Sequence, residues 1–225
     1  MKSIARVFLV VLIGCGKPAE HELPPGADQH HPATMVHRFD DAERWAKVFD
    51  DPGRDAWQHP DDVVAALGLT PNMSVADVGA GTGYFTVRLA RAVPDGHVIA
   101  TDIEPDMVRY LGDRARREQL ANVRAVLATG DDPRLEPSSV DRILIVDVWH
   151  HVADRGAYAK GLAAALRPGG QVAIVDFTQE ATHGPPREHR LRPDAIITDL
   201  QGAGLDASLA PTSLPDQFII IGRRR

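Results

Sequence analysis

Hydrophobic positions along this 225-residue chain fall into two alternating patterns. Short, nearly unbroken apolar runs are typical of strands buried on both faces of a parallel sheet. Between them, apolar residues recur every three or four positions, which is typical of helices. Strands are predicted at 74–77, 97–101, 122–128, 140–146, 171–177, 205–209 and 218–221. Strands that alternate with helices predict an α/β fold, and the length suffices for one domain with a full core.

Helical periodicity predicts where the connecting segments are ordered. Two helical patterns occupy residues 38–67, separated by a polar loop at 49–60. Further helices are predicted after the glycines that follow residue 77, from Pro105 through Leu111, and at 157–166 and 193–200. The polar segment 178–193 has no such period and is long for a connection, so it is a candidate lid over a substrate.

The end of the first predicted strand carries the most informative motif. Asp77 is followed by Gly79, Gly81 and Gly83, in the pattern D-x-G-x-G-x-G, and a helical pattern begins directly afterwards. Glycines permit a backbone with positive φ and close approach of a ligand, and the N-terminus of a helix carries a partial positive charge. A ligand with a polar, partly anionic end is therefore predicted here.

The spacing excludes one class of ligand. A dinucleotide fingerprint needs G-x-G-x-x-G, but Tyr84 or Thr86 stands at its last glycine position. The pattern instead resembles the class I S-adenosylmethionine-dependent methyltransferases, over about residues 60–222, and most of all the branch with ubiquinone and menaquinone C-methyltransferases. The resemblance implies a Rossmann-like, seven-stranded, mostly parallel sheet with helices on both faces and a C-terminal antiparallel hairpin.

The resemblance also assigns a cofactor, S-adenosyl-L-methionine, and residues to hold it. Asp77 and the glycines would bind the methionine part. Asp102, at the tip of the second strand, would accept both ribose hydroxyls, and Ile103 would lie against the adenine. Asp131 would bond the adenine amino group, with Asp132 as its competitor. The expected activity is methyl transfer to a small-molecule acceptor that the sequence does not name.

The central strand at 140–146 places further candidates at the carboxyl edge of the sheet, where α/β folds bind ligands. Asp147 is expected to contact the cofactor. His150 or His151 could take a proton from an oxygen or nitrogen acceptor. In the alternative interpretation, His150 caps the next helix or bonds backbone.

The aromatic residues and the single cysteine bear on how the methyl group could be transferred. Trp149, Trp57 or Tyr84 could face the cofactor sulfonium through a cation–π contact. No metal site is predicted. A thiol relay, as in arsenite methylation, is disfavoured because Cys15 is the only cysteine.

Residues 1–15 have the pattern of a secretory signal. Lys2 and Arg6 precede an apolar run at 7–13 that is too short to cross a bilayer. The run closes in Leu-Ile-Gly-Cys, which resembles the bacterial lipobox, so a lipidated Cys15 would anchor the chain in the cell envelope. Gly16 after the cysteine leaves outer-membrane sorting open.

The remaining organisation follows from composition. Residues 16–37 are rich in proline, histidine and glutamate and predict a flexible linker, which leaves 38–225 as the methyltransferase domain. Translation from Met35 would instead leave a cytoplasmic enzyme. Because export removes a domain from a cytosolic cofactor, a membrane-anchored envelope binding protein on a catalytically silent methyltransferase scaffold is a second hypothesis. With a net charge of −6 and no basic stripe, no nucleic acid partner is predicted.

Overall fold

The computed structural model describes residue 39 and residues 41–225. The predicted signal, its Cys15, the linker and Met35 lie outside the described residues. Seven strands form one sheet: β1 (Ser74–Val78), β2 (His97–Asp102), β3 (Val123–Leu127), β4 (Val140–Val146), β5 (Leu166–Phe177), β6 (Asp206–Ala210) and β7 (Gln217–Arg223).

Ten helical segments of the described part connect and flank these strands. The α-helices are α1 (Ala42–Phe49), α2 (Asp55–Gln58), α3 (Pro60–Ala65), α4 (Tyr84–Ala92), α5 (Pro105–Arg117), α6 (Arg155–Ala165) and α7 (Pro193–Gly202). The 3₁₀ turns are η1 (Pro52–Arg54), η2 (Trp149–His151) and η3 (Arg187–His189).

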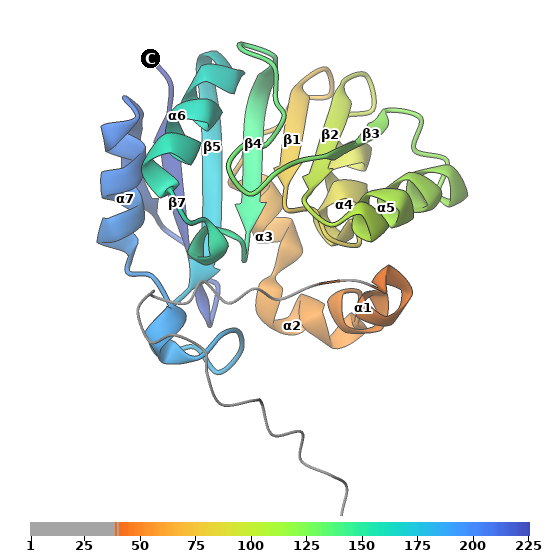
Figure 1. Cartoon of the computed structure of the whole chain (residues 1–225), viewed down its shortest axis with the longest axis horizontal. Helices are drawn as coiled ribbons and strands as arrows, with labels where there is room; N and C mark the ends of the chain where they lie inside the picture. Colours follow the sequence, from red (N-terminus) through yellow and green to blue (C-terminus); the bar gives the residue numbers. More distant parts are fainter. Residues whose placement is uncertain (1–38, 40) are drawn as a thin grey trace, which may run out of the picture. The chain divides into compact units, whose positions relative to one another are not determined.

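The strand order confirms the predicted sheet. The order is β3-β2-β1-β4-β5-β7-β6, in which β7 is antiparallel to both of its neighbours and the other pairs are parallel (Figure 1). The β6–β7 pair is the predicted C-terminal hairpin. From β1 the chain continues toward β2 and β3, and from β4 it continues toward β5, in the opposite direction along the sheet. The connections that leave β1 and β4 therefore diverge, and a crevice forms between the carboxyl ends of these two strands.

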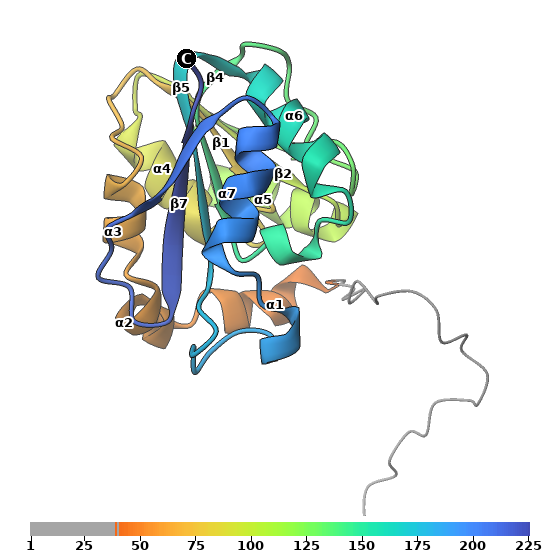
Figure 2. The ribbon, with the colours of Figure 1, turned by 90° about the vertical axis from the view of Figure 1, so that its left-hand side faces the viewer.

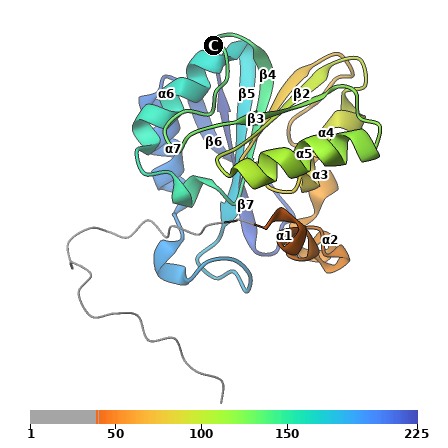
Figure 3. The same cartoon turned by 45° about the vertical axis from the view of Figure 1, so that its right-hand side comes forward.

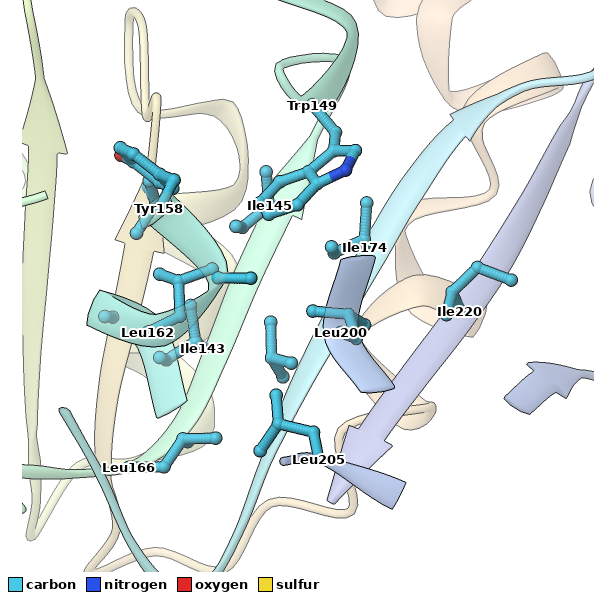
Figure 4. Close-up of a cluster of buried hydrophobic side chains, with 14 of the residues drawn as sticks. Ile143, Ile145, Trp149, Tyr158, Leu162, Leu166, Ile174, Leu200, Leu205 and Ile220 are labelled. Atoms are coloured by element: carbon cyan, nitrogen blue, oxygen red, sulfur yellow. The ribbon is translucent and has the colours of Figure 1, made fainter. Parts of the chain in front are cut away.

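Two apolar layers hold helices against the two faces of the sheet. On one face, α3 and α4 pack over Val75, Leu144 and other buried strand residues. On the other, α6 and α7 pack over residues such as Ile143, Ile145 and Ile174 (Figures 2 and 4). Strands with both faces covered explain the nearly continuous apolar runs of the sequence.

The segment before the sheet, which contains α1 and α2, lies along the carboxyl edge of the sheet (Figures 1 and 3). The N–H of Ala42 donates to Asp106 of α5 at 2.7 Å, and Glu43 pairs with Arg109 of α5 at 2.7 Å. These contacts fasten α1 to the main body.

Two segments differ from the sequence prediction. The expected polar loop at 49–60 contains η1 and α2, because Asp51 caps the first turn through Gly53 N–H at 2.7 Å. The fifth strand begins at Leu166 rather than at 171, since its first residues pair backbone with the C-terminal segment: Arg224 N–H donates to Gly170 at 2.9 Å.

Candidate functional site

A cavity of about 870 Å³ opens at the carboxyl edge of the sheet. Its walls come from segments far apart in sequence: α1 and η1, the glycine turn, and the ends of β2, β4 and β5. Such a volume is typical of a site for a cofactor-sized ligand.

The described part of the chain has no helix that is both long and apolar enough to cross a membrane.

The glycine turn, residues 79–83, is held in its conformation by the residues that pack against it. Gly79, Gly81 and Gly83 have φ of 72°, 55° and 91°, a region that favours glycine. A Cβ on Gly79 would lie 2.3 Å from a methyl carbon of Val148. The carbonyl of Thr101 accepts the N–H of Gly79 at 2.8 Å, so the turn is tied to β2. The backbone is thus held in the open form that admits a ligand.

Asp77 lines the cavity and is 3% exposed. Burial raises the pKa of its carboxyl to about 6, although the hydroxyl of Thr86, which donates to it at 2.6 Å, opposes the shift. A buried carboxylate with a single side-chain donor is suited to a cationic group of a ligand.

Asp102 organises the turn as well as facing the cavity. One carboxylate oxygen accepts the N–H of Gly81 at 2.8 Å and the other accepts the N–H of Glu104 at 3.0 Å. Burial raises the pKa of this carboxyl, and both backbone bonds oppose the shift. Each oxygen keeps a further lone pair, so two ribose hydroxyls can still be accepted.

The predicted adenine end is more open. Ile103 is 56% exposed and lines the cavity beside Asp102. Asp131 also lines it, and the hydroxyl of Thr129, which donates at 2.6 Å, lowers the pKa of this carboxyl. Its competitor Asp132 lies outside the lining and pairs with Arg134 at 3.3 Å.

Asp147 is a further carboxylate that lines the cavity. Its φ of 60° turns the chain sharply after β4. Burial raises the pKa of its carboxyl to about 7, while Arg54, whose Nη2 lies 3.7 Å from Oδ2, opposes the shift. Gln217, at the start of β7, donates its amide to Oδ1. All the carboxylates predicted to bind cofactor therefore line one cavity.

The two histidines have different environments. His150 is buried, and its Nδ1 lies 2.9 Å from a carboxylate oxygen of the fully buried Asp176. Burial lowers the pKa of His150, but the bond to Asp176 outweighs it, so the pKa is raised. His150 is absent from the cavity lining, whereas His151 is part of it. This places only His151 where it can meet an acceptor.

The aromatic candidates also separate. Trp149 is fully buried between β4 and α6, with its ring 6.1 Å from that of Tyr158 (Figure 4), so the prediction that it faces a sulfonium is wrong. Trp57 and Tyr84 do line the cavity. His59, in the same segment as Trp57, lies outside the lining and contacts Asp62.

The predicted lid at 178–193 reaches the cavity at Gly184. The ring of His183 stacks on that of Trp57, with centroids 4.7 Å apart, and its Nδ1 bonds Asp216. Arg190 gathers the loop, because its guanidinium donates to five carbonyl oxygens between residues 178 and 185. The lid is thus a folded segment closed against the α2 wall.

Orphaned polar atoms indicate that the cavity is built for a polar ligand. In the part of the chain that the structure describes, two buried side-chain hydroxyls lack a hydrogen-bond partner, those of Thr82 and Thr101, and both residues line the cavity. A buried hydroxyl without a partner is costly. Together with the glycine cradle, this fits S-adenosylmethionine.

Sequence reasoning missed several residues of the site. Arg54, Gln58 and Gln217 form a side-chain ring with Asp147, and Gln58 and Gln217 are buried. Polar residues in an apparent loop and at a strand start gave no local signal of this. The burial of the two glutamines, whose side chains are mostly exposed in proteins, identifies them once the structure is known.

Comparison with known proteins agrees with this geometry. Residues 75–170 match the model of a methyltransferase domain. The chain is 32% identical over 167 residues to an uncharacterized methyltransferase of Mycobacterium tuberculosis, covering 74% of this chain and 62% of the relative. It is 35% identical over 112 residues to a demethylmenaquinone methyltransferase of Tropheryma whipplei, covering 50% of this chain and 45% of that one.

Among solved structures, a SAM-dependent methyltransferase from Aquifex aeolicus superposes with a TM-score of 0.75 at 26% identity, covering 82% of this chain and 99% of that chain. The chain spans less than two thirds of the length of the curated relatives named above. Residues 75–170 thus match a methyltransferase domain, and the chain has the fold of the SAM-dependent methyltransferase from Aquifex aeolicus.

Proposed function

We propose that this chain, which carries a methyltransferase domain of the S-adenosylmethionine-dependent fold, transfers a methyl group to a small-molecule acceptor. One observation carries the proposal. The glycine turn, Asp77, Asp102 and Asp147 converge on a single cavity that is large enough for a cofactor and an acceptor side by side.

The bound cofactor would supply a methyl group already activated by its positive sulfur. The residues of the chain then have to position and desolvate the reactants, which can contribute up to ~7 to 11 kcal/mol in well-oriented systems. Asp77 and the glycine turn would hold the methionine end, and Asp102 would hold the ribose. Ile103 and Asp131 would contact the adenine. The carboxylates suit the positive charge of the ligand.

The acceptor would enter between Trp57, Phe177 and the lid at Gly184, all of which line the cavity. Their apolar surfaces favour an acceptor with an apolar body. His151 would take the proton from an oxygen or nitrogen acceptor. The buried pair of His150 with Asp176 would hold the η2 turn that presents His151, since the two histidine rings lie 4.2 Å apart.

Calorimetric titration with S-adenosylmethionine and S-adenosylhomocysteine tests the cofactor site. We expect micromolar binding that Asp102→Ala weakens at least tenfold, because that change removes the ribose acceptor and the bond to Gly81. Asp132→Ala, just outside the cavity lining, is the matched control and should bind normally. No binding by the folded wild type would contradict the proposal and favour the silent, membrane-anchored scaffold.

A screen of acceptors with His151→Gln tests the base. We expect a loss of turnover of about 10²- to 10⁴-fold with an oxygen or nitrogen acceptor, and unchanged cofactor affinity. Full turnover of the variant with its natural acceptor would remove His151 from this role.

A further inference from the structure

The first helix of the described chain, α1, has an apolar face that is only partly covered. Ala42 is its one buried residue, whereas Trp45 and Phe49 are half-buried and Val48 is 58% exposed. No other large apolar side chain in the described part of the chain is more exposed than Val48. An amphipathic helix of a globular protein turns its apolar stripe toward the core, so part of the cover of α1 has to come from elsewhere.

Three aromatic rings make this surface continuous. The ring centroid of Phe39 lies 4.9 Å from that of Trp45 and 5.7 Å from that of Phe49, and Trp45 stacks on Phe49 at 5.3 Å. None of the three rings is fully buried. Val48 follows Trp45 by three positions and extends the same surface. Single apolar residues are ordinary on a surface, but a contiguous apolar patch indicates an interaction, and we call these four residues the α1 patch.

The charges around the α1 patch balance one another. Glu43 and Asp50 form ion pairs of 2.7 and 2.8 Å with arginines of α5 (Figure 3). The other charged residues between 41 and 51 are two cations and two acids, namely Arg44, Lys47, Asp41 and Asp51. With a local net charge near zero, apolar burial rather than charge has to drive binding to this surface. A half-exposed tryptophan beside charged groups suits the boundary between apolar and aqueous phases.

The preceding sequence indicates which apolar phase the patch would meet. Phe39 belongs to the α1 patch and is the first residue that the structure describes, and Cys15, the predicted site of lipidation, precedes it by 24 positions. An unstructured chain of that length has a root-mean-square end-to-end distance of roughly 24 to 29 Å. A bilayer that held Cys15 would thus face the patch at an effective concentration of about millimolar, at which a weak apolar surface suffices for binding.

The α1 patch is also part of the cavity wall. Phe39, Val48 and Phe49 line the cavity, and a Cβ on Gly81 of the glycine turn would lie 3.6 Å from the ring of Phe49. Docking through this patch would therefore hold the carboxyl edge of the sheet, where the cavity opens, at the surface that the patch binds.

We propose that the α1 patch is a docking surface for a lipid bilayer, into which Val48 and Trp45 insert while the predicted lipid anchor keeps the chain nearby. The choice of a bilayer as the partner rests on the predicted anchor at Cys15, whereas the docking does not depend on methyl transfer. Because the neighbouring charges balance, docking needs no anionic lipid and changes little with salt.

A fluorescent label at position 48 tests the docking. The full chain with Cys15→Ser and an N-terminal histidine tag is held on phosphatidylcholine vesicles by a nickel-chelating lipid, so that every chain is at the bilayer. Val48→Cys then supplies the only thiol for an environment-sensitive label. We expect its emission to rise about twofold or more on vesicles and to be quenched by spin-labelled acyl chains, because an interfacial helix buries its apolar face about 5 to 10 Å deep.

Leu209→Cys, labelled in the same way, is the matched control. Leu209 is 53% exposed, but it lies on β6, the edge strand at the opposite end of the sheet from β3, and it does not line the cavity. Its label should keep the emission that it has in solution. A label at Lys47→Cys should respond like the label at position 48, and adding Val48→Asp should abolish that response, since a charge resists burial.

The outcomes separate docking from its rivals and from the proposed function. Equal responses at positions 48 and 209, or no response at position 48, would overturn the docking surface. A shifted emission at position 48 without vesicles would also overturn it: dependence on protein concentration would assign the patch to a second copy of this chain, and independence would assign it to the chain's own preceding residues. Calorimetry with S-adenosylmethionine needs no vesicles, so a failure there would contradict the proposed function and leave the docking surface intact.

Discussion

At the scale of single residues, the site combines acids whose burial opposes their charge. Burial raises the pKa of Asp77 to about 6 and that of Asp147 to about 7. A carboxyl whose folded pKa exceeds its usual value of 3.8 binds more protons in the folded than in the unfolded state as pH rises from about 4 to 6. The folded state therefore loses stability over that range. A bound ammonium group would offset this cost, because its positive charge would stabilise the buried carboxylates.

The variant Asp77→Asn tests how much stability the buried charge of Asp77 costs. The variant keeps an oxygen that can accept from Thr86 but has no charge to bury. We expect its free energy of unfolding to exceed that of the wild type by up to about 2 to 3 kcal/mol at pH 8 and to match it near pH 4. Denaturant unfolding at both pH values measures the difference.

The same variant should bind S-adenosylmethionine at least tenfold more weakly at pH 8, since the cationic ligand loses its partner. Wild-type affinity should itself fall as the pH is lowered from 8 to 5, because both acids become protonated. A variant that is destabilised at pH 8, or wild-type affinity that does not change over this range, would contradict this account.

At the scale of elements, the turn between β1 and α4 depends on close backbone packing. Gly79→Ala would place a methyl group 2.3 Å from Val148 at a φ of 72°. We expect a loss of stability of about 2 kcal/mol or more, together with loss of cofactor binding. Gly161→Ala in α6, with no atom within 4 Å of the added carbon, is the control and should be neutral or stabilising by up to about 1 kcal/mol. Equal melting temperatures for the two variants would disprove the packing argument.

Within the lid, Arg190 is the side chain that links the backbone of the loop to itself, while His183 ties the loop to Trp57 and Asp216. Arg190 donates to carbonyl oxygens of five loop residues, which gives a segment with little regular structure a fixed shape. Arg190→Met should increase amide exchange between residues 178 and 190 by at least tenfold and leave the strands unchanged, because those contacts lie within the loop. Hydrogen-exchange mass spectrometry resolves the two regions. Arg187→Met, on the same loop, should not alter exchange; a matching increase there would deny Arg190 its special role.

At the scale of the whole molecule, the cavity is a joint product of the pre-sheet segment and the sheet. The described residues, 39 and 41–225, belong to one compact unit. The lipobox-like Cys15 and the linker precede it in sequence, and we propose that they attach it to the cell envelope.

Mass spectrometry of the native N-terminus tests the anchor. We expect the mature chain to begin at a lipidated Cys15, and Cys15→Ser to move the protein from the membrane fraction to a soluble or uncleaved form. A native N-terminus at or just after Met35 would contradict the anchor and support a cytoplasmic enzyme. Cofactor binding by the unit from residue 34 onward should match that of the full chain in either case.

The sequence by itself determined the sheet and one half of the site. Parallel strands that are buried on both faces have nearly unbroken apolar runs, so β1 to β5 could be predicted from the local sequence. A ligand that approaches the backbone at a strand–helix turn favours glycines there, so the turn after Asp77 could also be predicted locally, as could Asp102 at the end of the next strand. Asp147 follows for the same reason, because the carboxyl ends of adjacent parallel strands share one edge.

Only the tertiary structure decided which neighbouring side chains face the cavity. Trp149 and His151 are two residues apart, yet one is fully buried in the core and the other lines the site, because the η2 turn directs consecutive residues to different sides. The ring that links Arg54 to Gln217 joins residues over 160 positions apart in sequence. No local pattern encodes such contacts, since they exist only once the pre-sheet segment has folded against the edge of the sheet.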